Sequence, residues 1–537
     1  MAADRPYYKD LGEYLQVLED RGKLVRVKRR INKDTELMPL VRWQFRGLPE
    51  EERKAFLFEN VTDVKGRTYD MPVVVGAHAA SRDIYALAMN CRPDEIQPRW
   101  VEAQDSSIAA ELVEEAPVQE VVQMGEELEK EGGGLEQFPA PISLPGFDPA
   151  PFITSGLWIT KDPETGVPNI GTYRVHIKSR TRTGIQLGIG QHLGIHWTKA
   201  KSLGRPLEVA IALGGPPCLG LVSTAKIPYG MDELAVAGGI AREPIKVVKC
   251  KTVDIEVPAF AEIVLEGIMP TDQVEPEGGF GEYTGYMGTR TTSPYFEVRC
   301  ITLRKNPIYH AFIGQFPPSE DSKIRILAQE ATIYRFLKYQ CNIPGILEVC
   351  LHEASGGNAI WVIRLKKLNP MQPWQALNCA SGFSPNMGKF IIAVDEDIDA
   401  RDTDSVFWAM GYRVQPHLDI RTTPGKALGL DPSSYQPGTF SSGDFAIIPP
   451  RPDTSGLLID ATRKWGYPPV SLPKQEYMEH AKEIWEELGL PKLNPKRPWY
   501  GYSLGLWTGE NEEEADLALK GDHFLTGEKL AKGRKKV

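Results

Sequence analysis

The first part of the chain combines a helical apolar pattern with strand-like ones. Residues 8–22 place apolar side chains at helical spacing, and Asp10 and Glu13 have the spacing of a capping box at a helix start. The run at 24–28 alternates apolar and basic residues, and the run at 71–78 is short and apolar, as strands are. The pattern therefore predicts an α/β unit at the N-terminus.

A segment rich in proline and glycine follows this unit. No regular helix or strand persists at the density of proline found in FPAPISLPGFDPAP. The pattern then changes to short β-rich runs separated by turn signals, which is typical of an all-β barrel or sandwich. We expect an N-terminal α/β domain at 1–131, a linker at 132–151 and a central β domain at 152–322.

The α/β pattern returns after residue 322. Apolar residues at helical spacing predict a helix over 323–340, and three later apolar runs predict buried strands at 345–351, 359–365 and 390–397. We place a C-terminal α/β domain at 323–470.

The last segment, 471–537, is predicted to be a helical tail. A helix over 474–490 carries Trp485 and Leu488 on an apolar face, which suits docking on a partner subunit and equally suits packing on its own domain. The basic end at 527–537 is expected to fray.

Composition and charge exclude several classes of protein. The chain has 537 residues, of which 42% are hydrophobic, and this excludes a disordered protein. The 62 Lys and Arg against 71 Asp and Glu give a net charge of −9, which argues against a general nucleic-acid-binding protein.

Cysteines and apolar runs bear on the compartment. The seven cysteines are widely spaced and form no C-x-x-C pair, so neither a disulfide framework nor a zinc ribbon is expected. The start lacks a signal-peptide pattern, and the longest uncharged stretch, 209–225, falls short of the about 20 residues that span a membrane. We therefore expect a soluble, cytoplasmic protein with neither a membrane nor a nucleic-acid partner.

Two glycine-rich segments depart from nucleotide-binding motifs. The glycines at 188–194 are one residue off the dinucleotide fingerprint and lie in the β-rich region, and the segment 382–389 is one residue too long for a P-loop. We expect turns at both places, although Lys389 could still meet a phosphate as a point charge.

A loop with three glycines presents two carboxylates, Glu277 and Glu282. If both face a cleft, repulsion and desolvation raise the pKa of one of them, so that it keeps a proton near neutrality. An arginine beside them would hold the other ionised, which gives an acid/base device for chemistry at a carboxylic acid. A surface loop with solvated glutamates is the alternative that the spacing leaves open.

Asn169, His192 and Glu233 supply an amide oxygen, an imidazole and a carboxylate. That set suits Mg²⁺ or Mn²⁺ better than structural zinc, and it leaves coordination positions for phosphate oxygens and water. Three unrelated residues are the alternative, and His196 is a rival to His192.

Several motifs together resemble the UbiD family of decarboxylases, which use prenylated FMN. The motifs are NIGTYR, GQH, IPYGMDE and EGGFGEYTGY, and they occur in the order and spacing of that family. The similarity extends from DLGEYLQVLEDRGKLVRV near the start to VDEDIDARDTDSVFWAMGYR. The usual family loop is E-G-P-F-G-E, and here Gly279 replaces the proline.

The resemblance implies the fold and the cofactors. The fold would be an N-terminal α/β domain, a central split β-barrel for the flavin, a C-terminal α/β domain and a helical tail. Asn169, His192 and Glu233 would hold Mn²⁺, or Mg²⁺, against the cofactor phosphate. A K⁺ ion would lie near Val222, Ser223, Ala225 and Glu233. The residues implied to contact the flavin are Asn169, Ile170, Gly171, Thr172, Arg174, Gln191, His192, Glu233 and Lys389.

The resemblance also implies the reaction. Arg174, Glu277 and Glu282 would be catalytic, with Glu282 as the acid/base of a reversible, non-oxidative decarboxylation. The substrate would be an aromatic or α,β-unsaturated acid, or an aryl-CoA thioester such as phthaloyl-CoA. The pocket would draw on 325–335 and 436–446.

Alternatives and partners follow from the same resemblance. A carboxylase acting in reverse and a non-catalytic flavin-binding or storage protein are the alternatives. A flavin prenyltransferase would supply the cofactor, and the chain would form a homodimer or homohexamer. The basic residues between 21 and 33 could meet CoA phosphates or could be a solvated face.

Overall fold

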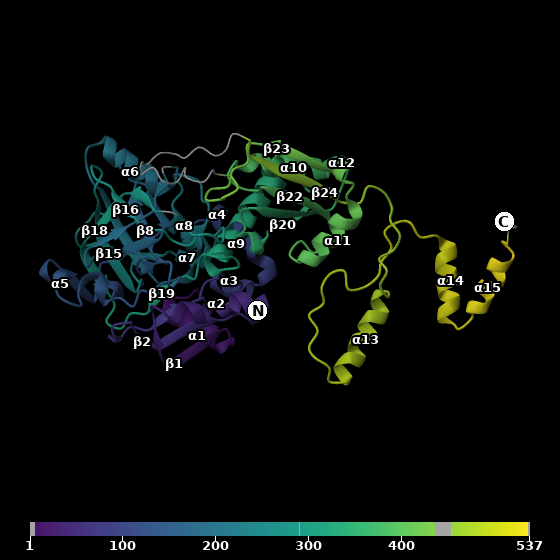
Figure 1. Cartoon of the computed structure of the whole chain (residues 1–537), viewed down its shortest axis with the longest axis horizontal. Helices are drawn as coiled ribbons and strands as arrows, with labels where there is room; N and C mark the ends of the chain where they lie inside the picture. Colours follow the sequence, from purple (N-terminus) through teal and green to yellow (C-terminus); the bar gives the residue numbers. More distant parts are fainter. Residues whose placement is uncertain (1–5, 189, 289, 435–452, 535–537) are drawn as a thin grey trace.

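The computed structural model describes residues 6–188, 190–288, 290–434 and 453–534. Three units follow one another along the chain, and a tail extends away from the last of them (Figure 1). No helix in the described ranges is long and apolar enough to cross a membrane.

The N-terminal sheet has the order β1-β2-β4-β19, and β3 pairs with β2. Its strands are β1 (Leu24–Asn32), β2 (Ala55–Thr62), β3 (Thr68–Tyr69), β4 (Val73–Val75) and β19 (Tyr309–Ala311). Its helices are α1 (Leu11–Asp20), α2 (Leu37–Gly47), α3 (Arg82–Ala88) and α4 (Ile96–Asp105). Helix α1 starts at the predicted cap, because the Asp10 side chain accepts a hydrogen bond from the Glu13 backbone N–H.

The central sheet has nine strands in the order β7-β10-β11-β18-β15-β12-β8-β9, with β6 paired to β18. The strands are β6 (Val121–Met124), β7 (Phe152–Ile153), β8 (Leu157–Lys161), β9 (Pro168–Thr172), β10 (Val175–Ile177), β11 (Arg182–Gly184), β12 (Leu207–Leu213), β15 (Ile263–Met269) and β18 (Tyr295–Leu303). Strand β9 is one edge, whereas β10 lies next to the opposite edge, yet only Tyr173 and Arg174 join them. An extended chain of two residues spans only about 7 Å. The sheet must therefore curl until its two edges lie next to each other. This is the split barrel.

Smaller strands flank the barrel. One sheet has β5 (Glu111–Leu112), β13 (Lys246–Lys249) and β14 (Glu256–Pro258), and a hairpin pairs β16 (Glu275–Glu277) with β17 (Thr291–Ser293). The linker contains one 3₁₀ turn, at Gly134–Gln137. The domain boundaries that we drew from the sequence remain a prediction, and strands do cross between units, since β6 joins the central sheet and β19 the N-terminal one.

The expectation of an all-β central region is wrong at three helices. These are α6 (His192–Ser202), α7 (Pro217–Thr224) and α8 (Glu233–Ala241). Helices α7 and α8 are buried almost throughout, so their sequences are apolar on every face and lack a helical period. Glycines let α8 pack closely, because a Cβ at Gly239 would lie 2.3 Å from the Ala103 carbonyl oxygen in α4.

The C-terminal domain is a five-stranded sheet in the order β20-β21-β22-β24-β23. Its strands are β20 (Ile346–Leu351), β21 (Ile360–Leu365), β22 (Phe390–Asp395), β23 (Ile420–Pro424) and β24 (Ser455–Ala461). Its helices are α9 (Glu320–Arg335), α10 (Gln372–Phe383), α11 (Thr403–Arg413) and α12 (Pro416–Asp419). Helix α9 joins the units, because Lys323 forms ion pairs with Glu50 of the N-terminal unit (2.8 Å) and with Glu353.

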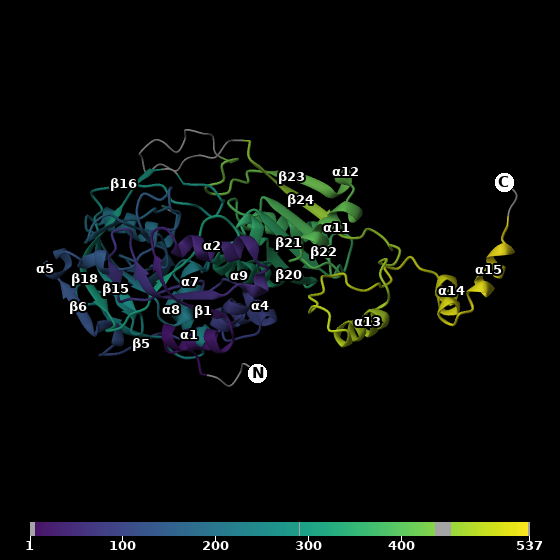
Figure 2. The same ribbon diagram turned by 60° about the horizontal axis from the view of Figure 1, so that its bottom comes forward.

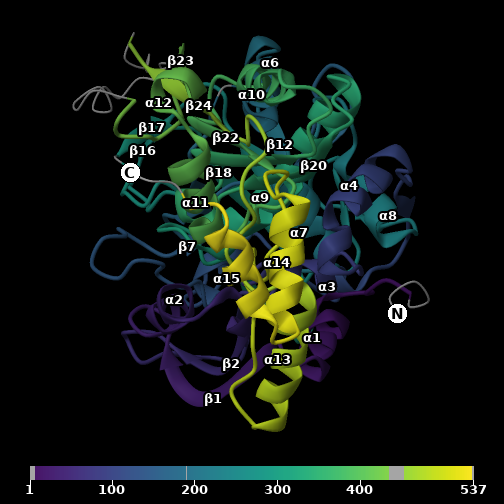
Figure 3. The same cartoon turned by 90° about the vertical axis from the view of Figure 1, so that its right-hand side faces the viewer.

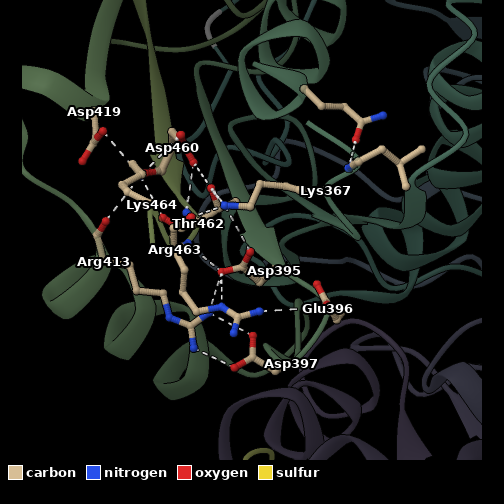
Figure 4. Close-up of polar contacts among 12 residues, drawn as sticks. Lys367, Asp395, Glu396, Asp397, Arg413, Asp419, Asp460, Thr462, Arg463 and Lys464 are labelled. Carbon is tan, nitrogen blue, oxygen red and sulfur yellow. Dashed lines mark hydrogen bonds and ion pairs between the residues drawn. The ribbon is translucent and has the colours of Figure 1, made fainter. Parts of the chain in front are cut away.

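A charge network with buried Asp395 and Arg413 lies at the carboxyl end of β22, the middle strand of this sheet (Figure 4). Arg413 Nη1 donates to Asp395 Oδ2 at 2.8 Å, and Arg413 Nη2 donates to Asp397 Oδ2 at 2.7 Å. Tyr502, which belongs to the tail, donates to the same Asp397 oxygen at 2.8 Å. The network therefore attaches the segment between α13 and α14 of the tail to the C-terminal sheet.

The tail contains α13 (Gln475–Glu487), α14 (Gly509–Leu519) and α15 (His523–Ala531). It projects from the C-terminal domain in two views (Figures 1 and 2), and its helices stand in front of the body when seen from that end (Figure 3). None of the three helices has a buried residue. Helix α15 extends to Ala531, into the segment for which fraying is predicted.

Candidate active site

The centre of the site is Arg174, held between two glutamates. Its Nε and Nη2 donate to the two oxygens of Glu277 at 3.2 and 3.1 Å, and its Nη1 donates to Glu282 Oε1. Arg174 lies in the two-residue connection between β9 and β10, where the edges of the barrel meet. Glu277 ends β16 and is 1% exposed. The curl of the sheet thus brings together three residues that are 103 and 108 positions apart in the sequence.

Electrostatics give the two glutamates different roles. Burial raises the pKa of Glu282, and Arg174 only partly opposes this shift. Glu277 instead meets the guanidinium with both oxygens, the geometry that stabilises a carboxylate best. Glu282 is therefore suited to carry a proton, and Glu277 is suited to hold the guanidinium in place.

The glycines of the loop are required by close packing. A Cβ at Gly278 would lie 2.5 Å from Pro149, and one at Gly281 would lie 2.5 Å from Leu144. A Cβ at Gly279 would lie 2.5 Å from the Gly288 carbonyl oxygen, so a proline here would force that carbonyl to move. The linker lies directly against the catalytic loop.

Asp148 of the linker is a residue that the sequence analysis missed. Its Oδ2 accepts from the Leu144 backbone N–H at 2.8 Å, while its Oδ1 is buried without a hydrogen-bond partner among the described residues. Desolvation raises its pKa to about 6, and the charge of Arg174 opposes the shift. The proline-rich sequence of the linker predicts an irregular segment, and it does not indicate that Asp148 lies near Arg174.

A second cluster joins Asn169, His192 and Glu233. Asn169 Oδ1 lies 2.7 Å from His192 Nδ1, and His192 Nδ1 lies 3.6 Å from Glu233 Oε1. Ligands around an octahedral ion with bonds of about 2.1 Å are separated by about 3 Å, so these distances fit such an ion. With the amide turned over, its nitrogen would instead donate to His192 (2.7 Å) and Glu233 (3.3 Å). In the first orientation the lone pairs of an amide, an imidazole and a carboxylate converge, whereas the turned amide would place a donor there.

The structure distinguishes His192 from His196 as the histidine that lies beside Asn169 and Glu233. His196 is buried, its Nδ1 lies 2.9 Å from Thr160 Oγ1, and burial lowers its pKa to about 4. Tyr229 packs edge-on against His192 at 5.1 Å between ring centres and donates to Asp162 at 2.5 Å. Only His192 faces Asn169 and Glu233.

Helix starts and strand β9 position this cluster. His192 is the first residue of α6 and Glu233 the first of α8. Asn169, Ile170, Gly171 and Thr172 lie on β9, and the Ile170 N–H donates to Glu233 Oε2 at 3.2 Å. Gln191 is the residue that precedes α6, and its side-chain Oε1 accepts a hydrogen bond from the Gly188 N–H at 2.9 Å.

The remaining predicted residues fall into two places. Val222, Ser223 and Ala225 lie at the end of α7, and Ser223 Oγ is 2.8 Å from Thr172 Oγ1 on β9, beside the Asn169 cluster. Lys389 lies just before β22 and pairs with Asp431 at 2.9 Å. Within the described residues, Lys389 donates hydrogen bonds to Asp431 and Ser433 rather than to the Asn169 cluster. Residues 436–446 lie outside the described residues.

A third polar cluster, His78, His310 and Glu320, is fully buried away from these two. His78 Nδ1 lies 3.1 Å from His310 Nε2. Glu320 accepts from the backbone N–H groups of Gly76 and His78 at 3.0 and 2.9 Å. Since its oxygens already serve the backbone, Glu320 ties the ends of β4 and β19 to the start of α9.

Three consecutive regions of the chain match known protein domains. The matches are to the N-terminal, Rift-related and C-terminal domains of 3-octaprenyl-4-hydroxybenzoate carboxy-lyase, at 15–104, 111–316 and 324–461. They follow the order of the three structural units. The protein is therefore an enzyme of the carboxy-lyase class. It belongs to the UbiD family.

Similar proteins cover almost the whole chain. An uncharacterized protein of Archaeoglobus fulgidus is 32% identical over 510 residues, which are 90% of this chain and 98% of its own. An evolved dimeric form of the UbiD-class enzyme HmfF from Pelotomaculum thermopropionicum, solved with prFMN, is 30% identical with a TM-score of 0.73. That match covers 85% of this chain and 95% of HmfF.

A third similar protein is a decarboxylase. The 3,4-dihydroxybenzoic acid decarboxylase from Enterobacter cloacae is 27% identical with a TM-score of 0.74, over 85% of this chain and 95% of its own. These matches confirm the family and the three-domain fold that the resemblance implied. They also support a flavin as the cofactor.

Proposed function

We propose that the protein is a reversible, non-oxidative decarboxylase of an aromatic or α,β-unsaturated carboxylic acid, and that it uses prenylated FMN. The observation that carries the proposal is Arg174 held between Glu277 and Glu282, with the pKa of Glu282 raised by burial. A flavin-storage protein needs only the phosphate site, and it would not need this acid/base arrangement.

Asn169, His192 and Glu233 would hold Mn²⁺, or Mg²⁺, against the cofactor phosphate. Their converging lone pairs support this assignment, and so do the starts of α6 and α8, where helix dipoles favour an anion. Main-chain oxygens at Val222, Ser223 and Ala225, with Glu233, would hold K⁺ nearby. Ile170, Gly171, Thr172, Gln191 and Lys389 complete the proposed flavin contacts.

The chain's own groups have separate tasks in the reaction. The flavin, when bound, supplies the electron sink for the electrons left behind as CO₂ departs. Arg174 uses one N–H on each of Nη1 and Nη2, the two that its glutamates leave free, to orient the substrate carboxylate. Glu282 delivers a proton to the carbon that lost CO₂, and Glu277 fixes Arg174 in place. The CO₂ concentration decides the direction, so the reverse carboxylation belongs to the same machinery.

The substrate is a free acid in our proposal. The basic residues that could meet CoA phosphates are partly neutralised, because Arg26 pairs with Glu19 (2.7 Å) and Lys23 pairs with Asp83 (2.8 Å). An aryl-CoA thioester such as phthaloyl-CoA is the second candidate. We also propose that a flavin prenyltransferase supplies the cofactor in the cytoplasm and that the enzyme is a homodimer or homohexamer.

The test is CO₂ release from a panel of aromatic and α,β-unsaturated acids and their CoA thioesters. Glu282→Gln is expected to keep its flavin and lose turnover by about 100-fold or more, the size of a general-acid contribution. Glu275→Gln is the matched control, because Glu275 pairs with Lys178 at 2.7 Å outside the site. Full activity of Glu282→Gln would contradict the assignment, and flavin binding without turnover of any acid would favour a storage protein.

A further inference from the structure

Tyr229 lies against the proposed metal ligand His192 but has no task in the proposed reaction. The ring centres of Tyr229 and His192 are 5.1 Å apart, and those of Tyr229 and His196 are 5.9 Å apart, with both contacts edge-on. Lys199 Nζ lies 5.6 Å from the centre of the same tyrosine ring. Residues 192, 196 and 199 share one face of α6, because they follow the helical spacing. The Tyr229 ring therefore lies along the face of α6 that begins with His192.

The hydroxyl of this tyrosine is fixed at the turn that follows β8. Tyr229 Oη donates to Asp162 Oδ2, and Lys199 Nζ donates to both oxygens of Asp162, at 3.1 and 2.8 Å. Asp162 is buried, and its Oδ1 also accepts from the Glu164 backbone N–H at 2.9 Å. The carboxylate of Asp162 is thus held by its own turn. It ties both Tyr229 and α6 to the wall of the barrel.

A tight turn between α7 and α8 presents the tyrosine to α6. The Met231 N–H donates to the Pro228 carbonyl oxygen at 3.1 Å, and Gly230 has a φ of +87°. A type II turn requires a positive φ at this position, which glycine adopts without strain. Tyr229 itself is 43% exposed, so burial does not hold its ring in place. The hydrogen bond to Asp162 does.

The imidazole of His192 needs a neighbour that fixes its orientation. Its side chain is 26% exposed, and within the described residues its polar contacts involve Nδ1, which faces Asn169 and Glu233. A partly exposed imidazole rotates between rotamers unless a packed neighbour blocks it. The groups that orient metal ligands typically change metal affinity by about 10- to 100-fold. The anchored ring of Tyr229 packs against the imidazole and restricts that rotation.

We propose that Tyr229, anchored on Asp162, is a positioning residue that holds His192 in the orientation that binds the divalent ion. Tyr229 acts through His192 and is not itself a ligand. This inference rests on the proposed function, because it takes the divalent ion to be bound by Asn169, His192 and Glu233. It extends the site beyond its ligands to the turn between α7 and α8 and to the turn after β8.

The test measures Mn²⁺ binding to the full chain loaded with FMN, from the EPR signal of the ion that remains free. Tyr229→Phe keeps the ring but loses the bond to Asp162, and Tyr229→Ala loses both. We expect the affinity for Mn²⁺ to fall about 10-fold in Tyr229→Phe and up to about 100-fold in Tyr229→Ala. The affinity for FMN without Mn²⁺, measured by flavin fluorescence, should remain that of the unsubstituted protein. A general loss of structure would lower both affinities together.

Tyr295→Phe is the matched control. Tyr295 lies on β18 and donates to Gln273 at 3.1 Å, so the loss of its hydroxyl should leave Mn²⁺ binding unchanged. A double substitution tests whether Tyr229 acts through His192. His192→Gln removes the imidazole, so Tyr229→Phe should cause no further loss of Mn²⁺ affinity in that background. A further loss there, or a parallel loss of metal-free FMN affinity, would overturn the positioning role.

The outcomes separate this role from the proposed reaction. If the affinity for Mn²⁺ depends on Tyr229 as expected but no acid loses CO₂, the positioning role stands and the proposed reaction falls. If Tyr229→Phe binds Mn²⁺ as tightly as the unsubstituted protein, the positioning role falls and the decarboxylase proposal is unaffected. If the unsubstituted protein loaded with FMN binds no Mn²⁺, the positioning role falls together with the metal assignment, and CO₂ release still tests the reaction.

Discussion

At the scale of single residues, the position of Arg174 decides what the site can do. A guanidinium binds two carboxylates in a fixed planar geometry, which an ammonium on a flexible chain cannot reproduce. Arg174 holds Glu277 with two donors and leaves Glu282 with one, so the two glutamates are inequivalent. This inequivalence supports our proposal that Glu282 is the glutamate that carries the proton.

This assignment predicts a pH dependence. Glu282 acts as an acid only while protonated, so kcat should fall as the pH rises through its raised pKa. Asp321 contributes to that raised pKa. Asp321→Asn removes a negative charge, lowers the pKa of Glu282 and should move the alkaline limb of the kcat–pH profile to lower pH. Asp105→Asn, which breaks the Arg335 pair elsewhere on α9, is the control. A limb that stays in place, or moves to higher pH, would contradict the role of Glu282.

The sequence predicted that Arg174, Glu277 and Glu282 act together, and the structure brings these three side chains into contact, but only some of their neighbours were predicted. Glu277 and Glu282 stand out because glycines surround them, and the family motifs add Arg174. Asp148 carries no such signal. Its place beside Arg174 follows from the path of the linker, which no local sequence pattern reveals.

At the scale of elements, the buried helices are what the pattern missed. Helix α7 is apolar except for its last two residues, and α8 has glycines in its interior, so neither shows a helical period. The N-terminal helix and the C-terminal strands were predicted because each has one buried and one exposed face, or one continuous apolar run. A helix that is covered on all sides is apolar on every face, so its sequence has no period that distinguishes it from a buried strand.

Because α8 packs closely on α4, we expect a methyl group added at Gly239 to destabilise the protein. Gly239→Ala places a Cβ 2.3 Å from the Ala103 carbonyl oxygen, so we expect a loss of about 1–3 kcal/mol in the free energy of unfolding. Because α8 begins at Glu233, the variant should also bind flavin less tightly. Gly411→Ala in α11 is the control, since nothing lies within 4 Å of its Cβ position, and it should be neutral or slightly stabilising. Urea denaturation compares them, and equal effects of the two substitutions would refute the packing argument.

At the scale of the whole molecule, the order of the domains follows from the sequence, but the exchange of strands between them does not. Strand β6 joins the central sheet from before the linker, and β19 leaves the central region to complete the N-terminal sheet. Such pairings depend on residues far apart in the chain. The helical tail was predicted, and the structure adds that its helices bury nothing within their own chain.

The exposed tail predicts an assembly. Phe524, Leu488 and Leu530 are 76%, 68% and 63% exposed, which is unfavourable for helices that stand in water. We expect these side chains to pack on a second copy of the chain. Deletion of 507–537, which keeps Tyr502 on Asp397, should lower the oligomer mass in size-exclusion chromatography with light scattering. An unchanged mass would show that α14 and α15, which the deletion removes, do not hold the oligomer together.

The central claim is that this chain decarboxylates an acid with the help of prenylated FMN. The most direct measurement is made on the protein produced with and without a flavin prenyltransferase: mass spectrometry of the released cofactor, with CO₂ release from the same samples. The account predicts prenylated FMN and acid-dependent CO₂ release only in the co-produced protein. Equal CO₂ release from protein that holds unmodified FMN or no flavin would contradict it.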